Sequence, residues 1–173
     1  MRLFTDNKIP SINYKILSMI HYQANELMLN EEIRLSYNKL KYNFKNKIIL
    51  DIGADHKHSP KFFYNKKAKI IYAFTLETPT YFNNKIKWFN KYDQSIKLEP
   101  EPDFIKIDCE GCEYDINLNK LLKNKSWCIG FHYFPQYDNQ YRKMLLTYIN
   151  NDNSNILYQI GNEIMLTNVP FKR

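Results

Sequence analysis

The sequence predicts a single-domain α/β fold with a mostly parallel sheet, helices on both faces and an antiparallel hairpin at its C-terminal end. Three observations support this. At 173 residues, 44% of them hydrophobic, the chain can bury one sizeable core but is too short for two full domains. Apolar runs alternate with helix-length patterns, and the first strand, helix and strand fit within about 30 residues, as in a parallel unit. The last two apolar runs flank Gly161-Asn162, which suits a hairpin turn.

Residues 1–46 are expected to form a helical cover, and residues 47–173 the sheet-containing domain. Apolar residues recur at three- and four-residue spacing in two stretches, as on one face of a helix. The first helix is expected from Ser11, a possible N-cap, to about Leu29. The second carries Ile33, Tyr37, Leu40 and Phe44.

Residues 48–54 are rich in β-branched side chains and end near a glycine, as the first strand of a nucleotide-binding α/β unit does. Ser59 and Pro60 are a matched N-cap and first-turn pair, so a short helix is expected to start there. The later elements follow from the same patterns. They are strands at 69–74, 86–89 and 104–107, a short helix at 116–123, a strand at 127–132, a helix over 141–149 and a hairpin of 156–160 with 163–166.

Three acidic residues surround a glycine directly after the expected strand 104–107. Asp108 and Glu110 come first, Gly111 breaks the pattern, and Glu113 follows. In open α/β sheets, ligands bind outside the carboxyl ends of the strands. Asp108 and Glu110 are therefore candidates for a ligand site, and the alternative interpretation is a solvated acidic turn.

The run DFIKIDCEGCEYD at 103–115 resembles the motif D-F-[IL]-K-[IL]-D-x-E-G-x-E-x of FkbM-type S-adenosylmethionine-dependent methyltransferases. The similarity extends from about residue 48 to residue 166. Residues 49–54 resemble the family's first cofactor-binding motif, residues 72–79 resemble its A-F-E-P motif, and His132 matches a histidine at the end of a later strand.

The resemblance implies a Rossmann-like methyltransferase fold with S-adenosylmethionine as cofactor. In the first motif, which includes Ala54, Asp51 would order the loop through backbone hydrogen bonds and Gly53 would pass close to the cofactor. Glu77 would accept hydrogen bonds from the ribose hydroxyls.

On the substrate side, the resemblance implies a catalytic set of Asp108, Glu110 and His132. Methyl transfer needs mainly alignment, with His132 or Asp108 as a base for an alcohol. The expected reaction is O-methylation of a hydroxyl on a sugar, lipid or small metabolite.

The chain departs from the family's pattern at three places. Lys57 stands where a second glycine normally gives the backbone room to approach the cofactor. Residues are inserted before Glu77, and Gly130 replaces an acid two residues before His132. A degenerate member, which binds a protein or nucleic acid without catalysis, is therefore the alternative hypothesis.

A metal site is a further alternative, because polar residues with suitable ligand atoms follow several expected strands. Cys-x-x-Cys and His-x-His supply thiolate and imidazole ligands of the type that zinc prefers. Without a metal, both cysteines of the acidic motif would be packing residues. The candidate ligands are His56, His58, Cys109, Cys112 and His132.

The net charge of +7 favours anionic partners, nucleic acid among them, although the basic residues are scattered and also suit a solubilising surface. Three cysteines, an odd number, and the lack of a signal-like segment predict a reducing, cytoplasmic location. No apolar stretch reaches the roughly 18 residues expected of a membrane span.

Overall fold

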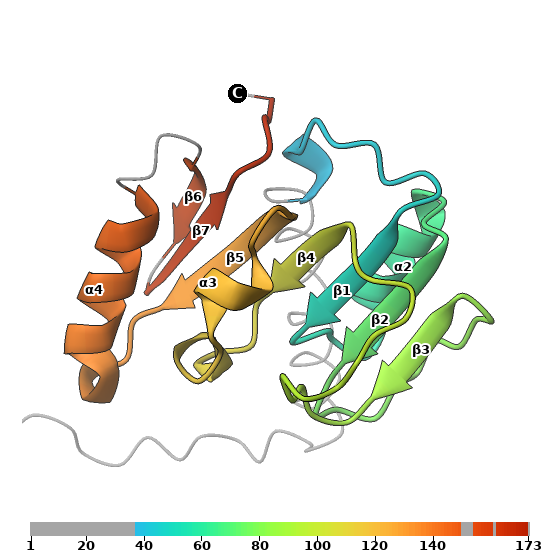
Figure 1. Ribbon diagram of the computed structural model, residues 1–173, viewed down its shortest axis with the longest axis horizontal. Coiled ribbons are helices and arrows are strands. Elements are labelled where there is room, and N and C mark those ends of the chain that lie inside the picture. Colours follow the sequence, from blue (N-terminus) through green and yellow to red (C-terminus); the bar gives the residue numbers. More distant parts are fainter. Residues whose placement is uncertain (1–36, 150–153, 161, 173) are drawn as a thin grey trace, which may run out of the picture.

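A seven-stranded sheet runs through the molecule in the order β3-β2-β1-β4-β5-β7-β6 (Figure 1). The structure, a computed structural model, describes residues 37–149, 154–160 and 162–172. Neighbouring strands from β3 to β5 are parallel, and β7 is antiparallel to both β5 and β6. The strands are β1 (Ile48–Ile52), β2 (Ile70–Phe74), β3 (Ile86–Phe89), β4 (Phe104–Ile107), β5 (Ser126–His132), β6 (Asn155–Ile160) and β7 (Glu163–Thr167).

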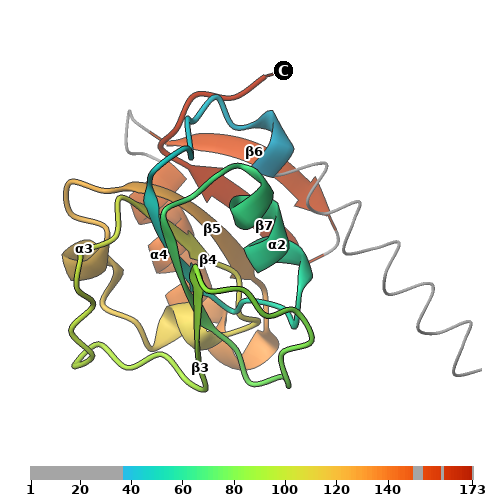
Figure 2. The ribbon, with the colours of Figure 1, turned by 90° about the vertical axis from the view of Figure 1, so that its right-hand side faces the viewer.

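Helices cover both faces of this sheet (Figure 2). α2 (His58–Asn65) packs on one face, whereas α3 (Leu118–Leu121) and α4 (Asp138–Ile149) pack on the other. In the part of the chain that the structure describes, no helix combines the length and apolar character needed to cross a membrane. The predicted fold class is confirmed, including the C-terminal antiparallel pair. Short 3-10 helices in the described residues are η1 (Tyr37–Lys39), η2 (Cys112–Tyr114) and η3 (Pro135–Tyr137).

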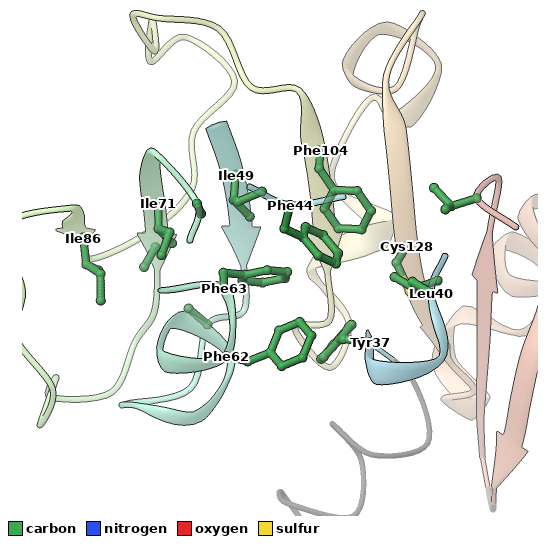
Figure 3. Close-up of a cluster of buried hydrophobic side chains, with 14 of the residues drawn as sticks. Tyr37, Leu40, Phe44, Ile49, Phe62, Phe63, Ile71, Ile86, Phe104 and Cys128 are labelled. Atoms are coloured by element: carbon green, nitrogen blue, oxygen red, sulfur yellow. The ribbon is translucent and has the colours of Figure 1, made fainter. Parts of the chain in front are cut away.

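Aromatic rings fill the core between α2 and the sheet (Figure 3). The ring of Phe104 on β4 lies 5.0 Å from that of Phe44 and 5.1 Å from that of Tyr42, measured between centroids. Phe63 reaches the same cluster from α2, 5.3 Å from Phe44. Because each buried aromatic ring contributes about 1.5–3 kcal/mol, this cluster holds the segment before β1 against the sheet.

The second expected helix is wrong over residues 40–44. Among the described residues of that stretch, only Tyr37–Lys39 is helical, and the helix is of the 3-10 type. Leu40 forms an antiparallel bridge with Phe171, and Phe44 is buried in irregular backbone. Pairing with the C-terminal residues thus replaces the helical hydrogen bonds. The first expected helix, at 11–29, lies outside the described residues.

The start of α2 also differs from the prediction, which placed the N-cap at Ser59. The helix begins at His58, with Lys57 at the N-cap position. Asp55 Oδ1 accepts hydrogen bonds from the backbone N–H of Ser59 (3.0 Å) and of Lys57 (3.2 Å). The aspartate therefore serves the free N–H groups of the first turn. This leaves the Ser59 hydroxyl to donate to Asp51 Oδ2 at 2.7 Å.

We predict that Phe104→Ala lowers the free energy of unfolding by about 3–5 kcal/mol, because it leaves a cavity among packed rings. Phe82, which is 72% exposed, offers a matched control, and Phe82→Ala should change stability very little. Urea denaturation of both variants measures the difference. Equal stability losses would show that the ring cluster does not support the fold.

Candidate functional site

Polar side chains gather at the edge of the sheet where β1, β4 and β5 end. These strands are parallel, so their carboxyl ends meet at one edge (Figure 1). Asp108 directly follows β4, and His132 is the last residue of β5. Because β7 runs antiparallel to β5, its first residue, Glu163, pairs with His132 at the same edge. The structure therefore brings Asp108 and His132 together, as the sequence predicted, and adds Glu163.

A buried ion pair joins β1 and β4 close to this edge of the sheet. The side chains of Asp51 on β1 and Lys106 on β4 are 0% and 3% exposed, and Lys106 Nζ lies 3.2 Å from Asp51 Oδ1. The same Nζ donates to the carbonyl of Gly53 at 2.7 Å. Burial raises the pKa of Asp51, although Lys106 and the Ser59 hydroxyl both oppose this shift. Asp51 thus orders the loop after β1 through side-chain contacts, where the sequence analysis expected backbone hydrogen bonds.

The two small residues after β1 are packed against neighbouring strands. Gly53 has a φ of 72°, and a Cβ there would lie 2.0 Å from the carbonyl oxygen of Asp108. Only glycine allows this approach between the loop and the end of β4. Ala54 is buried, and its N–H donates to the carbonyl of Phe74 on β2 at 2.9 Å. Both residues therefore set the path of the loop.

Glu77 lies three residues after the end of β2, and its side chain is 61% exposed. His56, in the loop after β1, contacts it twice. Glu77 Oε2 accepts a hydrogen bond from the backbone N–H of His56 at 3.2 Å and lies 2.9 Å from its ring Nδ1. The neighbouring Leu76 is 83% exposed. The Glu77 carboxylate therefore lies against the loop after β1.

Glu113 is a buried acid at this edge that the sequence analysis did not place in the site. It is 0% exposed, and its Oε1 accepts a hydrogen bond from the backbone N–H of His132 at 3.0 Å. The same oxygen lies 3.3 Å from His132 Nδ1. Its other oxygen accepts from the N–H of Gly111 at 2.8 Å. Glu113 thus joins the acidic turn to the end of β5, and its place in the motif was the only signal for it.

The imidazole of His132 lies between two carboxylates. Its Nε2 is 3.5 Å from Asp108 Oδ1, on the side opposite to Glu113. Burial lowers the pKa of His132, but the carboxylates of Glu113, Asp108 and Glu163 outweigh this effect and raise it above its usual value. The ring can therefore hold or release a proton at the sheet edge.

Glu163 is the second residue that the sequence analysis missed. Burial and the nearby Asp108 raise the pKa of its carboxyl, against the effect of Tyr158, whose hydroxyl donates to Glu163 Oε1 at 2.7 Å. Its pairing partner on β5 is His132, and Gly130 lies two residues earlier on that strand. A Cβ at that position would lie 3.0 Å from both Asp108 Oδ1 and Glu163 Oε1. The hairpin was predicted, but its register with β5, which places Glu163, was not.

The structure also places Glu110 and the two cysteines of the acidic motif. Glu110 has a φ of 50° and is exposed at the turn, outside the group formed by Asp108, Glu113, His132 and Glu163. Cys109 and Cys112 form a disulfide, with their Cα atoms 5.5 Å apart. They pack against the core, as expected, but as a disulfide, so they are not thiolate ligands.

The five ligands of the predicted metal site do not converge. His56 and His58 lie side by side, with ring centroids 5.7 Å apart. Within the described residues, however, the groups of three or more possible ligands include neither of them. One group is the disulfide with Glu113. The other is Asp108, His132 and Glu163, whose ligand atoms all lie within 4.8 Å of one another.

Comparison with known proteins relates the chain to viral proteins. No family model matches it. The sequence is 30% identical over 143 residues to uncharacterized protein 158B of Sulfolobus islandicus rod-shaped virus 1, across 73% of this chain and 88% of the viral protein. The chain belongs to the family of this viral protein. The sequence is also 32% identical over 105 residues to uncharacterized protein 65 of a Sulfolobus islandicus filamentous virus, across 56% of this chain and 65% of that protein.

The fold of the 158B family member is that of Rossmann-like methyltransferases. Precorrin-6y C5,15-methyltransferase from Geobacter metallireducens superposes with a TM-score of 0.52. The superposition covers 82% of this chain and 88% of the methyltransferase, at 12% sequence identity. At this identity, the likeness establishes the fold alone.

We predict that Lys106→Met destabilises the protein by about 3–5 kcal/mol, because it leaves the Asp51 carboxylate buried without its cation. The loss should shrink as the pH falls, since the pKa of Asp51 is already raised in the folded state and protonation removes the unpaired charge. Lys125 offers a control: it lies 2.9 Å from Glu101, whose side chain is 81% exposed. Lys125→Met should cost at most about 1 kcal/mol. Thermal and urea unfolding at two pH values test this, and equal losses for the two variants would contradict it.

Proposed function

We propose that this 158B family member is an S-adenosylmethionine-dependent methyltransferase of the FkbM type that methylates a hydroxyl group on a sugar, lipid or small metabolite. One observation carries the proposal. Asp108 and His132 approach to 3.5 Å beside the loop after β1, in a sheet with the strand order of methyltransferases. Ligands of open α/β sheets bind at this edge.

The residues at the edge suit the cofactor. Glu77 Oε2 is held by His56, which leaves Oε1 for the ribose hydroxyls, and the exposed Leu76 beside it offers an apolar surface for a purine. Lys57 has a φ of −159°, outside the left-handed region that favours glycine, so the sign of φ does not call for a glycine at this position. When bound, S-adenosylmethionine supplies an electrophilic methyl group on a sulfonium.

The acceptor hydroxyl would lie at the Asp108–His132 pair. Glu113 holds His132 Nδ1, so that Nε2 is directed to the side of Asp108. His132 Nε2 would accept the proton of the acceptor hydroxyl when its oxygen took the methyl group. Tyr37 donates a hydrogen bond to Asp108 Oδ2 at 3.2 Å and so directs Oδ1 toward the imidazole. Alignment of the acceptor by these fixed groups is the main contribution expected of the protein.

The first test is calorimetric titration with S-adenosylmethionine and S-adenosylhomocysteine. The wild type should bind both, and Glu77→Ala should weaken binding about tenfold, because one or two hydrogen bonds to the ribose are lost. Glu99→Ala, at another exposed acid, is the control and should bind like the wild type. A wild type that gives no heat with millimolar cofactor would refute the proposal and favour the alternative, a degenerate methyltransferase fold that binds a partner.

The second test is Asp108→Asn, which keeps the shape of the side chain and removes its charge. We expect transfer of labelled methyl groups to a panel of sugars, lipids and small alcohols to fall by about 10²-fold or more, since proton transfer contributes this much. His132→Asn should have a similar effect. Cofactor affinity should stay at the wild-type value, and the melting temperature of Asp108→Asn should be at or slightly above it. A clear fall in melting temperature with unchanged turnover would assign Asp108 a structural role.

A further inference from the structure

We propose that Asp108, His132 and Glu163 bind a divalent transition-metal cation in the space above Gly130. One carboxylate oxygen from each acid and one nitrogen of the histidine lie within 4.8 Å of one another. They come from three separate elements: the end of β4, the end of β5 and the start of β7. This set differs from the cysteine and histidine ligands that the sequence suggested.

Gly130 leaves the room that a cation would need. A Cβ at this position would lie 3.0 Å from Asp108 Oδ1, 3.0 Å from Glu163 Oε1 and 3.3 Å from His132 Cε1. All three side chains thus border the space above one residue without a side chain. A methyl group there would compete directly with a bound ion.

A second set of contacts orients each of the three ligands. Glu113 engages His132 Nδ1 at 3.3 Å and leaves Nε2 as the ligand atom. The Tyr37 hydroxyl donates to Asp108 Oδ2 at 3.2 Å, and the Tyr158 hydroxyl donates to Glu163 Oε1 at 2.7 Å. Metal-binding histidines usually give their second nitrogen to a carboxylate in this way, and ligating carboxylates are themselves hydrogen-bonded.

The ligand atoms also need a positive charge between them. When the Nδ1 proton of a neutral His132 points to Glu113, Nε2 is an acceptor that faces the carboxylate oxygens of Asp108 and Glu163, which are acceptors too. Lys106 Nζ lies 3.9 Å from Asp108, but on the side of Oδ2, where it is also bound to Asp51. A cation between these acceptor atoms, or a proton on Nε2, would remove the repulsion among them. The orienting contacts of all three ligands favour the cation.

Two carboxylates and one imidazole suit Mn²⁺ or Zn²⁺, because imidazole is a good ligand for transition metals and carboxylates suit the harder ions. Bound there, the ion would deepen the proposed function. It would hold the oxygen of the acceptor hydroxyl and make its proton easier to lose. His132 would then be a ligand in place of the base described above, and the proton would pass to water. This chemical role rests on the proposed methyl transfer, whereas the binding of the cation does not.

The test uses the full chain, stripped with chelator and titrated with Mn²⁺ at pH 8, with the loss of the free-ion electron paramagnetic resonance signal as readout. Zn²⁺ is titrated separately by calorimetry. We expect one saturable site for at least one of the two ions. Glu163→Gln and Gly130→Ala should each weaken binding tenfold or more, the first by removing a ligand and the second by filling the space. Asp115→Asn, at an exposed acid in the same loop, should bind like the wild type.

Each remaining outcome overturns the proposal. A wild type that takes up neither ion would leave a proton on His132 as the counter-charge. Wild-type affinity in both Glu163→Gln and Gly130→Ala would place the ion elsewhere, and equal weakening by Asp115→Asn would indicate binding to the acidic surface. Circular dichroism checks that the variants are folded, and two variants on different strands guard against the failure of one. Cation binding without methyl transfer would refute the proposed function alone, and chelator-resistant methyl transfer without cation binding would refute this inference alone.

Discussion

The site depends on one buried cation, the ammonium group of Lys106. It contacts the carboxylate of Asp51 and the carbonyl of Gly53, and so it joins the carboxyl ends of β1 and β4. Taking a lysine out of water is costly, and only this complete set of oxygen partners offsets the cost. Because Asp108 follows Lys106 by two residues, the same contacts fix the start of the acidic turn. The contacts of Lys106 therefore fix the position of the acidic turn relative to the loop after β1.

Residues two apart on a strand point to the same side of the sheet. On one face of this sheet, the side chains change from apolar to polar along β4 and β5. On β4, Phe104 belongs to the aromatic core, whereas Lys106 and then Asp108 are polar. On β5, the buried Cys128 is followed by Gly130 and His132. The aromatic core under α2 and the polar edge are thus two ends of one surface. The packed end supplies stability, and this allows the other end to hold carboxylates close together.

The sheet could be predicted because its signals are local. Runs of β-branched residues between turn residues fixed the strands, and the acidic motif correctly marked the edge where Asp108 and His132 meet. The errors have long-range causes. The helix expected through Leu40 fails because that residue pairs with Phe171, far along the chain. Glu113 can be buried because its carboxylate accepts a hydrogen bond from the backbone N–H of His132. The sequence of the turn alone does not reveal this contact.

The surroundings of Gly130 are likewise set by a neighbouring strand. Gly130 itself contributes no side chain at this position. In space, the carboxylate of Glu163 comes within 3.0 Å of where its Cβ would be, because β7 runs beside β5 with Glu163 opposite His132. An acid on β5 and an acid on β7 compete for one volume, so only one of them fits. Glu163 on β7 therefore supplies a negative charge beside His132, in a volume that the absence of a side chain at Gly130 leaves open.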